Sequence, residues 1–288
     1  MRTFVGIGAI LALLLVGYAL YANGTSSSDD HDSDIGIIES TSGSISPAPT
    51  MPIEATNGAI TDDVSDQGGP DSSDQRCFEA ASADDSALAG KTIIVDPGHG
   101  GEDLGTVNNQ FGLHESDLVL SISEYLRDML TASGANVCMT RVQDTYIELA
   151  ARADFANEQN GDALVSIHLN SLPDPSESYT MTMWGNEAKD RFLAETMLDV
   201  LRYEMAIPQY HNNEPNPTNP DVYILESLDS HMLKSADMPA VLVEATFLSA
   251  AWEAQAFQDG IDDGSHWREV QIAEAVHTGL TEYYEAFQ

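Results

Sequence analysis

The sequence predicts an α/β fold, with a mixed, mostly parallel sheet flanked by helices in a three-layer sandwich. Three short apolar runs, at residues 92–95, 163–168 and 240–243, are rich in β-branched side chains. Such runs are typical of strands that are buried on both faces. Strands alternate with segments of helical periodicity between the first two runs. Because parallel strands need long crossover connections, which are usually helical, this order indicates a mostly parallel sheet.

Each element is predicted from its own residues. Residues 115–133 carry apolar side chains at helical spacing, and Gly134 ends the pattern. Residues 146–159 form a second helical pattern, which Asn160 and Gly161 end. The other expected elements, in chain order, are a strand at 137–140, a strand at 179–184, a helix at 188–205, a loop at 206–220, a strand at 222–225 and a helix at 267–287.

The chain before residue 91 differs in composition from the rest. Residues 1–22 contain an uncharged, mostly apolar run from Phe4 to Ala22. As a helix this run would be roughly 28 Å long, close to the thickness of a bilayer core. We expect either a cleaved signal peptide or a retained membrane anchor here. Residues 23–90 predict a disordered, low-complexity acidic linker, and residues 91–288 predict one folded domain.

The charge of the chain excludes one class of partner. The formal net charge is −36, and residues 91–288 alone carry 33 acidic and 9 basic side chains, a net charge of −24. Nucleic-acid binding requires a basic surface, so no nucleic-acid partner is expected. We interpret the acidity as a surface suited to high ionic strength, where salt screens the self-repulsion. The alternative is that acidity keeps an exported protein soluble.

The two cysteines, Cys77 and Cys138, are compatible with an oxidising compartment. Cys138 lies on a predicted strand, and Cys77 lies just before the predicted domain. A disulfide between them would attach the end of the linker to the sheet. Two unpaired thiols are the alternative.

Four polar residues occur where the sheet is expected to place a site. His99 follows the first strand on a Pro97–Gly98 turn, while His168 and Glu244 end two later strands. Ligands of open α/β sheets bind beyond the carboxyl ends of the strands. Glu115 opens the first long helix, close in sequence to the loop that carries His99. These four residues form a candidate metallohydrolase site.

Two histidines and one glutamate are a zinc-binding set that leaves one coordination position open for catalysis. The sequence therefore predicts His99, Glu115 and His168 as ligands of one Zn²⁺ per chain. Glu244 is predicted to be the general base that takes a proton from the attacking water.

Each of these residues also has a structural interpretation. A histidine at a strand end is often only hydrogen-bonded, and Glu115 is an ordinary acidic residue at a helix start. Glu244 could cap a helix or pair with an arginine such as Arg141. His114, beside Glu115, is a rival metal ligand.

Four motifs in order resemble one enzyme family. They are residues 96–101 (DPGHGG), Glu115, residues 166–171 (SIHLNS), and residues 242–244 (LVE) with 247–249 (FLS). Together they resemble the zinc N-acetylmuramoyl-L-alanine amidases of the amidase-3 family, cell-wall hydrolases with a mostly parallel sheet flanked by helices. The resemblance implies that His99, Glu115 and His168 bind zinc and that Glu244 is catalytic.

The same resemblance implies a substrate and a location. The substrate is the amide between the lactyl group of N-acetylmuramic acid and L-alanine of peptidoglycan, and residues 91–288 would be the catalytic amidase domain. We expect an exported protein in the periplasm, cell wall or medium, with a possible membrane tether through residues 4–22. The alternatives are a zinc peptidase that cuts another stem-peptide bond, and a non-catalytic wall-binding protein.

Overall fold

A seven-stranded mixed sheet forms the centre of the computed structural model, which describes residues 76–81, 86–205 and 223–288. The strands lie in the order β1 (Cys77–Phe78), β5 (Asn136–Met139), β2 (Thr92–Pro97), β6 (Ala163–Asn170), β9 (Ala240–Phe247), β7 (Thr180–Trp184) and β8 (Tyr223–Ser227). Strands β5, β2, β6 and β9 are parallel to one another, while β1 and β7 pair antiparallel with their inner neighbours. The predicted mixed, mostly parallel sheet is confirmed.

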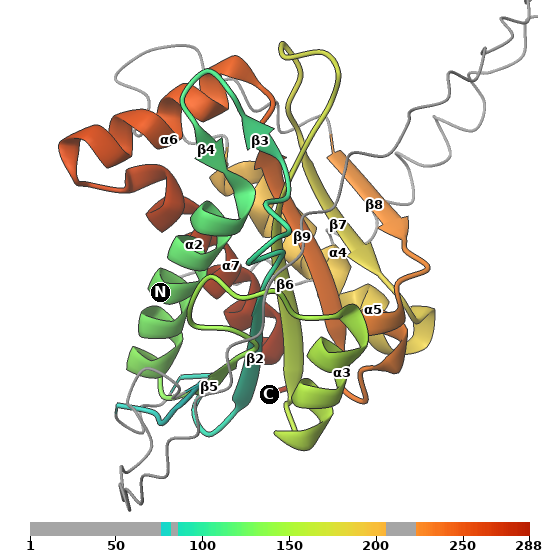
Figure 1. The fold of residues 1–288 in the computed structure, drawn as a ribbon. Helices are drawn as coiled ribbons and strands as arrows, with labels where there is room; N and C mark the ends of the chain where they lie inside the picture. Colours follow the sequence, from blue (N-terminus) through green and yellow to red (C-terminus); the bar gives the residue numbers. More distant parts are fainter. Residues whose placement is uncertain (1–75, 82–85, 206–222) are drawn as a thin grey trace, which may run out of the picture. The chain divides into compact units, whose positions relative to one another are not determined.

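Helices cover both faces of the sheet, as predicted (Figure 1). Three long helices, α2 (Glu115–Ala132), α4 (Glu187–Glu204) and α7 (Trp267–Glu285), share one core cluster, in which α2 and α4 each pack against α7 and against strands of the sheet. Two shorter helices, α3 (Leu149–Glu158) and α5 (His231–Ser235), pack together on the opposite face. A further helix, α6 (Ala251–Asp263), contacts α7, and a two-stranded hairpin of β3 (Val107–Asn108) and β4 (Leu113–His114) precedes α2.

The alternation of side chains along the strands fixes which face carries the site. Ile93 and Val95 are buried in the core beneath the three long helices, whereas Ile94 is buried with residues of α3 and α5. Leu164 and Leu242 lie on the same side as Ile94. Successive residues of a strand point to opposite faces, so the even-numbered polar residues that end these strands point toward α3 and α5.

The folded part extends further toward the N-terminus than the expected boundary at residue 91. Strand β1 joins the edge of the sheet, and Leu88 is fully buried in the larger core. Cys77 and Cys138 are partners across the β1–β5 pair and form a disulfide. This bond attaches the chain before the domain to the sheet, which is one of the two outcomes that the sequence left open.

Several expectations concern residues that the structure does not describe. The apolar run at 4–22, most of the linker and the loop at 206–220 lie outside the described residues. Among the described helices, none is long and apolar enough to cross a membrane.

Candidate metal centre and catalytic site

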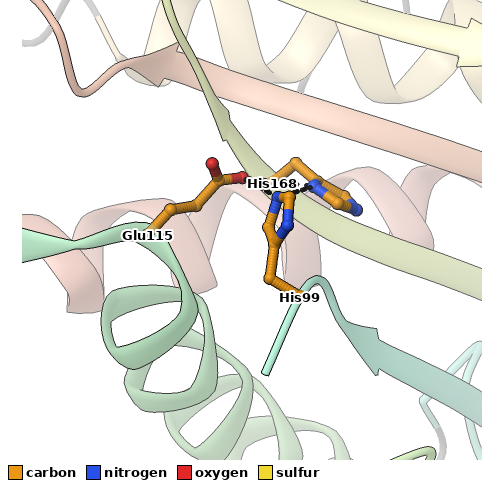
Figure 2. Close-up of side chains that lie close together, drawn as sticks. All are labelled: His99, Glu115 and His168. Atoms are coloured by element: carbon orange, nitrogen blue, oxygen red, sulfur yellow. Dashed lines mark hydrogen bonds and ion pairs between the residues drawn. The ribbon is translucent and has the colours of Figure 1, made fainter. Parts of the chain in front are cut away.

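Three side chains from separate elements converge at one point (Figure 2). Glu115 Oε1 lies 3.0 Å from His99 Nε2 and 3.1 Å from His168 Nδ1, and the two histidine nitrogens are 3.1 Å apart. His99 follows β2, His168 lies on β6, and Glu115 is the first residue of α2. In the described part of the chain these three residues are the group whose ligand atoms could hold one metal ion.

The donor set fits a small divalent cation. Zinc–nitrogen and zinc–oxygen distances of about 2.0–2.1 Å at tetrahedral angles place neighbouring ligand atoms about 3.3 Å apart, close to the separations observed. His99 Nδ1 lies 2.9 Å from Asp103 Oδ2. When neutral His99 donates a hydrogen bond from Nδ1–H to Asp103, its Nε2 atom has a lone pair that faces Glu115. Converging lone pairs require a proton or a cation between them. The residues present therefore fit Zn²⁺.

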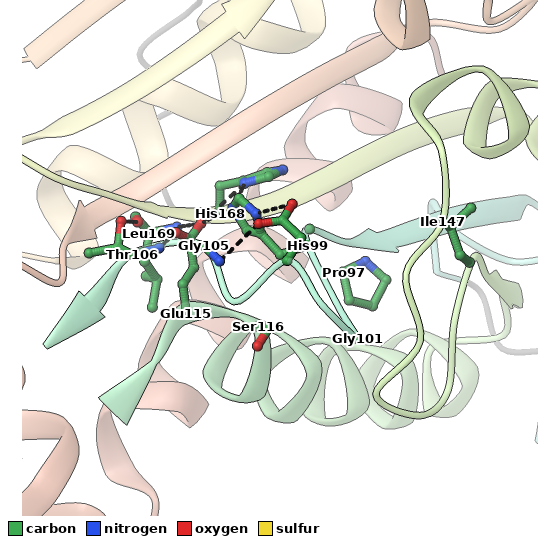
Figure 3. A network of polar contacts seen from close by, with 12 residues as sticks. Pro97, His99, Gly101, Gly105, Thr106, Glu115, Ser116, Ile147, His168 and Leu169 are labelled. Atoms are coloured by element: carbon green, nitrogen blue, oxygen red, sulfur yellow. Dashed lines mark hydrogen bonds and ion pairs between the residues drawn. The ribbon is translucent and has the colours of Figure 1, made fainter. Parts of the chain in front are cut away.

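Hydrogen bonds outside the cluster hold the Glu115 carboxylate in place. The backbone N–H of Thr106 donates to Oε2 at 2.8 Å, and that of Leu169 donates to Oε1 at 2.9 Å. Both residues lie next to Glu115 (Figure 3). Burial alone would raise the pKa of Glu115, but bonds from His168 and His99 outweigh it and hold that pKa well below its usual value. Glu115 is therefore a buried carboxylate, only 3% exposed, with the negative charge that a metal ion would require of it.

The turn that carries His99 requires glycine at two positions. A Cβ on Gly98 would lie 2.3 Å from His168 Cε1, and a Cβ on Gly105 would lie 2.6 Å from His99 Cδ2. Gly105 also has a φ of +65°, a conformation that glycine adopts without strain. His99 itself has a φ of 58°, which is uncommon for a residue with a side chain. The surrounding contacts must hold this turn in position.

Two buried arginines supply those contacts by donating to consecutive backbone carbonyls. Arg141 donates to the carbonyls of Pro97 (3.1 Å) and Gly98 (2.7 Å), and Arg152 donates to those of Pro97 (2.7 Å) and His99 (2.8 Å). Arg152 also donates to the carbonyl of Ile147, which lies on the far side of His99 from Glu115 in Figure 3. The two arginines thus fix the turn that carries His99.

A buried carboxylate pairs with one of these arginines. Asp96 Oδ1 accepts from Arg152 Nη1 at 2.7 Å and from the Thr140 hydroxyl at 2.5 Å, and Oδ2 accepts from the Ser166 hydroxyl at 2.6 Å. Burial raises the pKa of Asp96, but the charge of Arg152 and these hydrogen bonds outweigh burial and lower it below 3.8. Asp96 is therefore the counterion that offsets the cost of burying the Arg152 charge beneath the site.

Glu244 lies beside the three converging residues, and one of its oxygens has no partner. It pairs in register with His168 on the neighbouring parallel strand. Its Oε2 atom is buried without a hydrogen-bond partner within the described ranges. Burial, together with the negative charge of Glu115, raises the pKa of Glu244 well above 4.5. Such a carboxyl group is a stronger base than an exposed glutamate, and it lines a cavity of about 350 Å³ with the three converging residues.

The structure thus brings together all four residues that the sequence singled out. It does not bring His114 to the cluster, because the His114 ring faces Asp117, with Nδ1 3.4 Å from its Oδ2. Glu244 does not pair with Arg141, which donates to backbone carbonyls instead. Asp103, which contacts His99 Nδ1, was not predicted from the sequence, although its position four residues after His99 in a turn is a signal for such a contact.

Comparisons with known proteins agree with this geometry. Residues 93–282 match the Amidase_3 family, described as N-acetylmuramoyl-L-alanine amidase. The N-acetylmuramoyl-L-alanine amidase LytC of Bacillus subtilis is 29% identical over 201 residues, which are 68% of this chain and 36% of LytC. The probable cell wall amidase LytH of Staphylococcus epidermidis is 30% identical over 200 residues, which are 69% of this chain and 60% of LytH.

A solved structure shows the same fold. The N-acetylmuramoyl-L-alanine amidase from Clostridium difficile 630 superposes with a TM-score of 0.57 at 28% sequence identity, over 69% of this chain and 99% of that one. The structural match covers essentially the whole of that amidase. The sequence match to LytC, in contrast, covers only about a third of LytC. From the family match, these relatives and the shared fold, the chain belongs to the N-acetylmuramoyl-L-alanine amidase family Amidase_3.

Proposed function

We propose that the protein is a zinc-dependent amidase that hydrolyses the bond between the lactyl group of N-acetylmuramic acid and L-alanine of the peptidoglycan stem peptide. The observation that carries this proposal is the convergence of His99, Glu115 and His168 beside the unpartnered carboxyl group of Glu244. The family to which the chain belongs, and the names of LytC and the Clostridium difficile enzyme, support the choice of bond.

His99, Glu115 and His168 would hold one Zn²⁺ per chain, and a zinc ion so bound polarises carbonyl groups and lowers the pKa of water. The protein's own contribution is the placement of a base. Glu244 lies next to His168 in register, so its carboxylate is positioned to accept a proton from the water that attacks the lactyl carbonyl. Its raised pKa suits the second step, in which the same group returns the proton to the departing amine of L-alanine.

We further propose that the folded domain, residues 91–288 together with β1 and Leu88, acts as a catalytic domain outside the cytoplasm, on the wall side of the membrane. Residues 1–22 would direct export or serve as an anchor, and the chain between residue 22 and β1 would be the linker. The disulfide between Cys77 and Cys138 supports an oxidising location, because such bonds persist outside the reducing cytosol.

Digestion of purified peptidoglycan tests the proposal. The expected products are glycan strands with free lactyl carboxylates and intact stem peptides that begin with a free L-alanine amino group. Mass spectrometry of both fractions identifies the bond that was cut, and His168→Ala serves as the inactive control. Cleavage inside the stem peptide would identify a zinc peptidase instead. Wall binding with no released product would identify a non-catalytic protein.

A further inference from the structure

The carboxylate of Glu115 can rotate, so its hydrogen bonds must set how it faces the metal centre. The last torsion of a glutamate side chain is broad, and rotation about it exchanges the two oxygens. In the structure Oε1 faces the two histidine nitrogens, while the backbone N–H groups of Thr106 and Leu169 donate to Oε2 and Oε1, respectively. These two donors lie on different segments, the loop at 103–106 and strand β6. The orientation of Glu115 therefore depends on how firmly the loop and the strand are joined.

Leu169 can serve the site because strand β6 continues past the end of its neighbour β2. The pairing of these two strands ends at Pro97 and Ile167. The register between β6 and β9 also shifts between His168 and Asn170, so Leu169 is not among its paired residues. A residue at such an irregularity has peptide groups outside the regular ladder. Both peptide groups of Leu169 bond instead to groups outside the sheet.

The hydroxyl group of Thr106 joins the loop to the strand. Its Oγ1 atom donates to the carbonyl of Leu169 at 3.2 Å. The N–H groups of the same two residues donate to the two oxygens of Glu115 at 2.8 Å and 2.9 Å, so the three bonds close a ring around the carboxylate (Figure 3). The Thr106 carbonyl also accepts from the Glu115 backbone N–H at 2.9 Å, which fixes the loop to the first residue of α2.

The contribution of this hydroxyl group is geometric. Thr106 is half-buried and lines the cavity that also holds Glu244. In its absence a water molecule could donate to the Leu169 carbonyl, so no buried acceptor would be left without a partner. A water molecule is not attached to the loop, however, so the loop and the strand would no longer be joined directly.

We infer that Thr106 is a positioning residue for the metal centre: its hydroxyl group joins the loop to β6 and so holds Glu115 with Oε1 toward the two histidines. The inference rests on the proposed function, because it concerns how Glu115 would hold Zn²⁺. A carboxylate that is already fixed in this orientation loses little side-chain freedom when a metal binds, whereas a carboxylate that rotates loses more. Removing a hydrogen-bond partner that orients a metal ligand typically lowers metal affinity about 10–100-fold.

Two pairs of side chains at position 106 separate the effect of the hydroxyl group from the effect of size. Threonine and valine have nearly the same shape, as do serine and alanine, and only the first of each pair has a hydroxyl group. The wild type is therefore compared with Thr106→Val, and Thr106→Ser is compared with Thr106→Ala. Zinc is removed from the full chain with a chelator, and the affinity for Zn²⁺ is then measured by competition with a chromophoric chelator. Thermal unfolding of each metal-free protein is followed by circular dichroism.

The protein with the hydroxyl group should bind zinc about tenfold more tightly in both pairs. The metal-free proteins within a pair should differ in Tm by less than about 4 °C, since one half-buried hydrogen bond contributes little to stability. Thr131→Val is the matched control. Thr131 is also half-buried, and its hydroxyl group donates to the Arg127 carbonyl at 2.9 Å, but it lies in the last turn of the helix that Glu115 begins. This substitution should leave the zinc affinity unchanged.

Three results would overturn the inference. Zinc affinity could be equal within both pairs, or it could follow the size of the side chain, with Thr106→Ser and Thr106→Ala equally weak. The metal-free Thr106→Val and Thr106→Ala proteins could also unfold at a much lower Tm than their partners, which would make the role of the hydroxyl group structural. If the wild type bound no zinc, the proposed function would fail and the inference with it. That result is distinct from the others, in which the wild type binds zinc.

Discussion

Replacing Arg152 tests the account of how the His99 turn is held. The Arg152 side chain is 3% exposed and donates to Asp96 and to the carbonyls of Pro97, His99 and Ile147. Arg152→Met removes all these bonds and leaves the Asp96 carboxylate buried without a counterion. Removing one partner of a buried pair typically costs about 3–5 kcal/mol. Because Thr140 and Ser166 still donate to Asp96, we expect about 3 kcal/mol.

The assay is thermal unfolding followed by circular dichroism, with the disulfide intact. For a domain of this size, a loss of about 3 kcal/mol lowers Tm by about 6–12 °C. Arg191→Met is the matched control, since Arg191 makes two ion pairs on α4 but is exposed. Exposed i,i+4 pairs contribute about 0.3–0.5 kcal/mol each, so the loss of both costs about 1 kcal/mol at most and Tm should fall by less than about 4 °C. Equal losses in the two variants would show that the buried Arg152–Asp96 pair contributes no more to stability than exposed ion pairs do.

For Arg152→Met we also expect a pH-dependent difference in Tm from the wild type and a lower affinity for zinc. The folded-state pKa of Asp96 lies below its unfolded value of 3.8, so the pair contributes stability that is present above pH 3.8 and is lost as pH falls through the lowered pKa. The Tm difference between wild type and Arg152→Met should therefore shrink below pH 3.8. Zinc affinity should fall about 10–100-fold because the His99 turn is no longer fixed.

Three further predictions concern the disulfide, the turn and the surface charge. Reduction of Cys77–Cys138 opens a loop with a sequence separation of 61, which should cost about 4 kcal/mol and lower Tm by about 8–16 °C; an unchanged Tm under reducing conditions would reject this role. Gly98→Ala places a Cβ against the His168 ring, so zinc content and activity should fall together, and full zinc occupancy would contradict the close approach. With a net charge of −24 on residues 91–288, Tm should rise between 0.1 M and about 2 M NaCl, and a flat profile would leave the acidity as an aid to solubility.

Local sequence patterns predicted the parts of the fold that depend on local order. The segments that form β2, β6 and β9 were predicted because they are continuous apolar runs. Their parallel order brings their carboxyl ends together at one edge of the sheet. The site could be predicted for the same reason, because its residues follow or end these strands or open the helix that comes next. That a residue ends a strand can be predicted locally, and the parallel arrangement of the strands then places such residues close together.

The features that the sequence did not predict depend on contacts between distant residues. Helix α6 has few large apolar residues, and its end is fixed by the left-handed Gly264. Strand β1 has only two residues and depends on the disulfide to β5. The helix expected to begin at Tyr146 begins instead at Leu149, because Glu148 has a non-helical ψ of 143°; the Ile147 carbonyl before it accepts from Arg152.

The most direct test of the central claim measures zinc content beside the rate of lactyl release in two variants. Glu244→Gln keeps the shape of the side chain but removes the base, so one zinc per chain should remain while the rate falls about 10²–10⁴-fold. His168→Ala removes a ligand, so zinc content and rate should fall together. A Glu244→Gln variant that retained zinc and a near wild-type rate would contradict the assignment of Glu244 as the base.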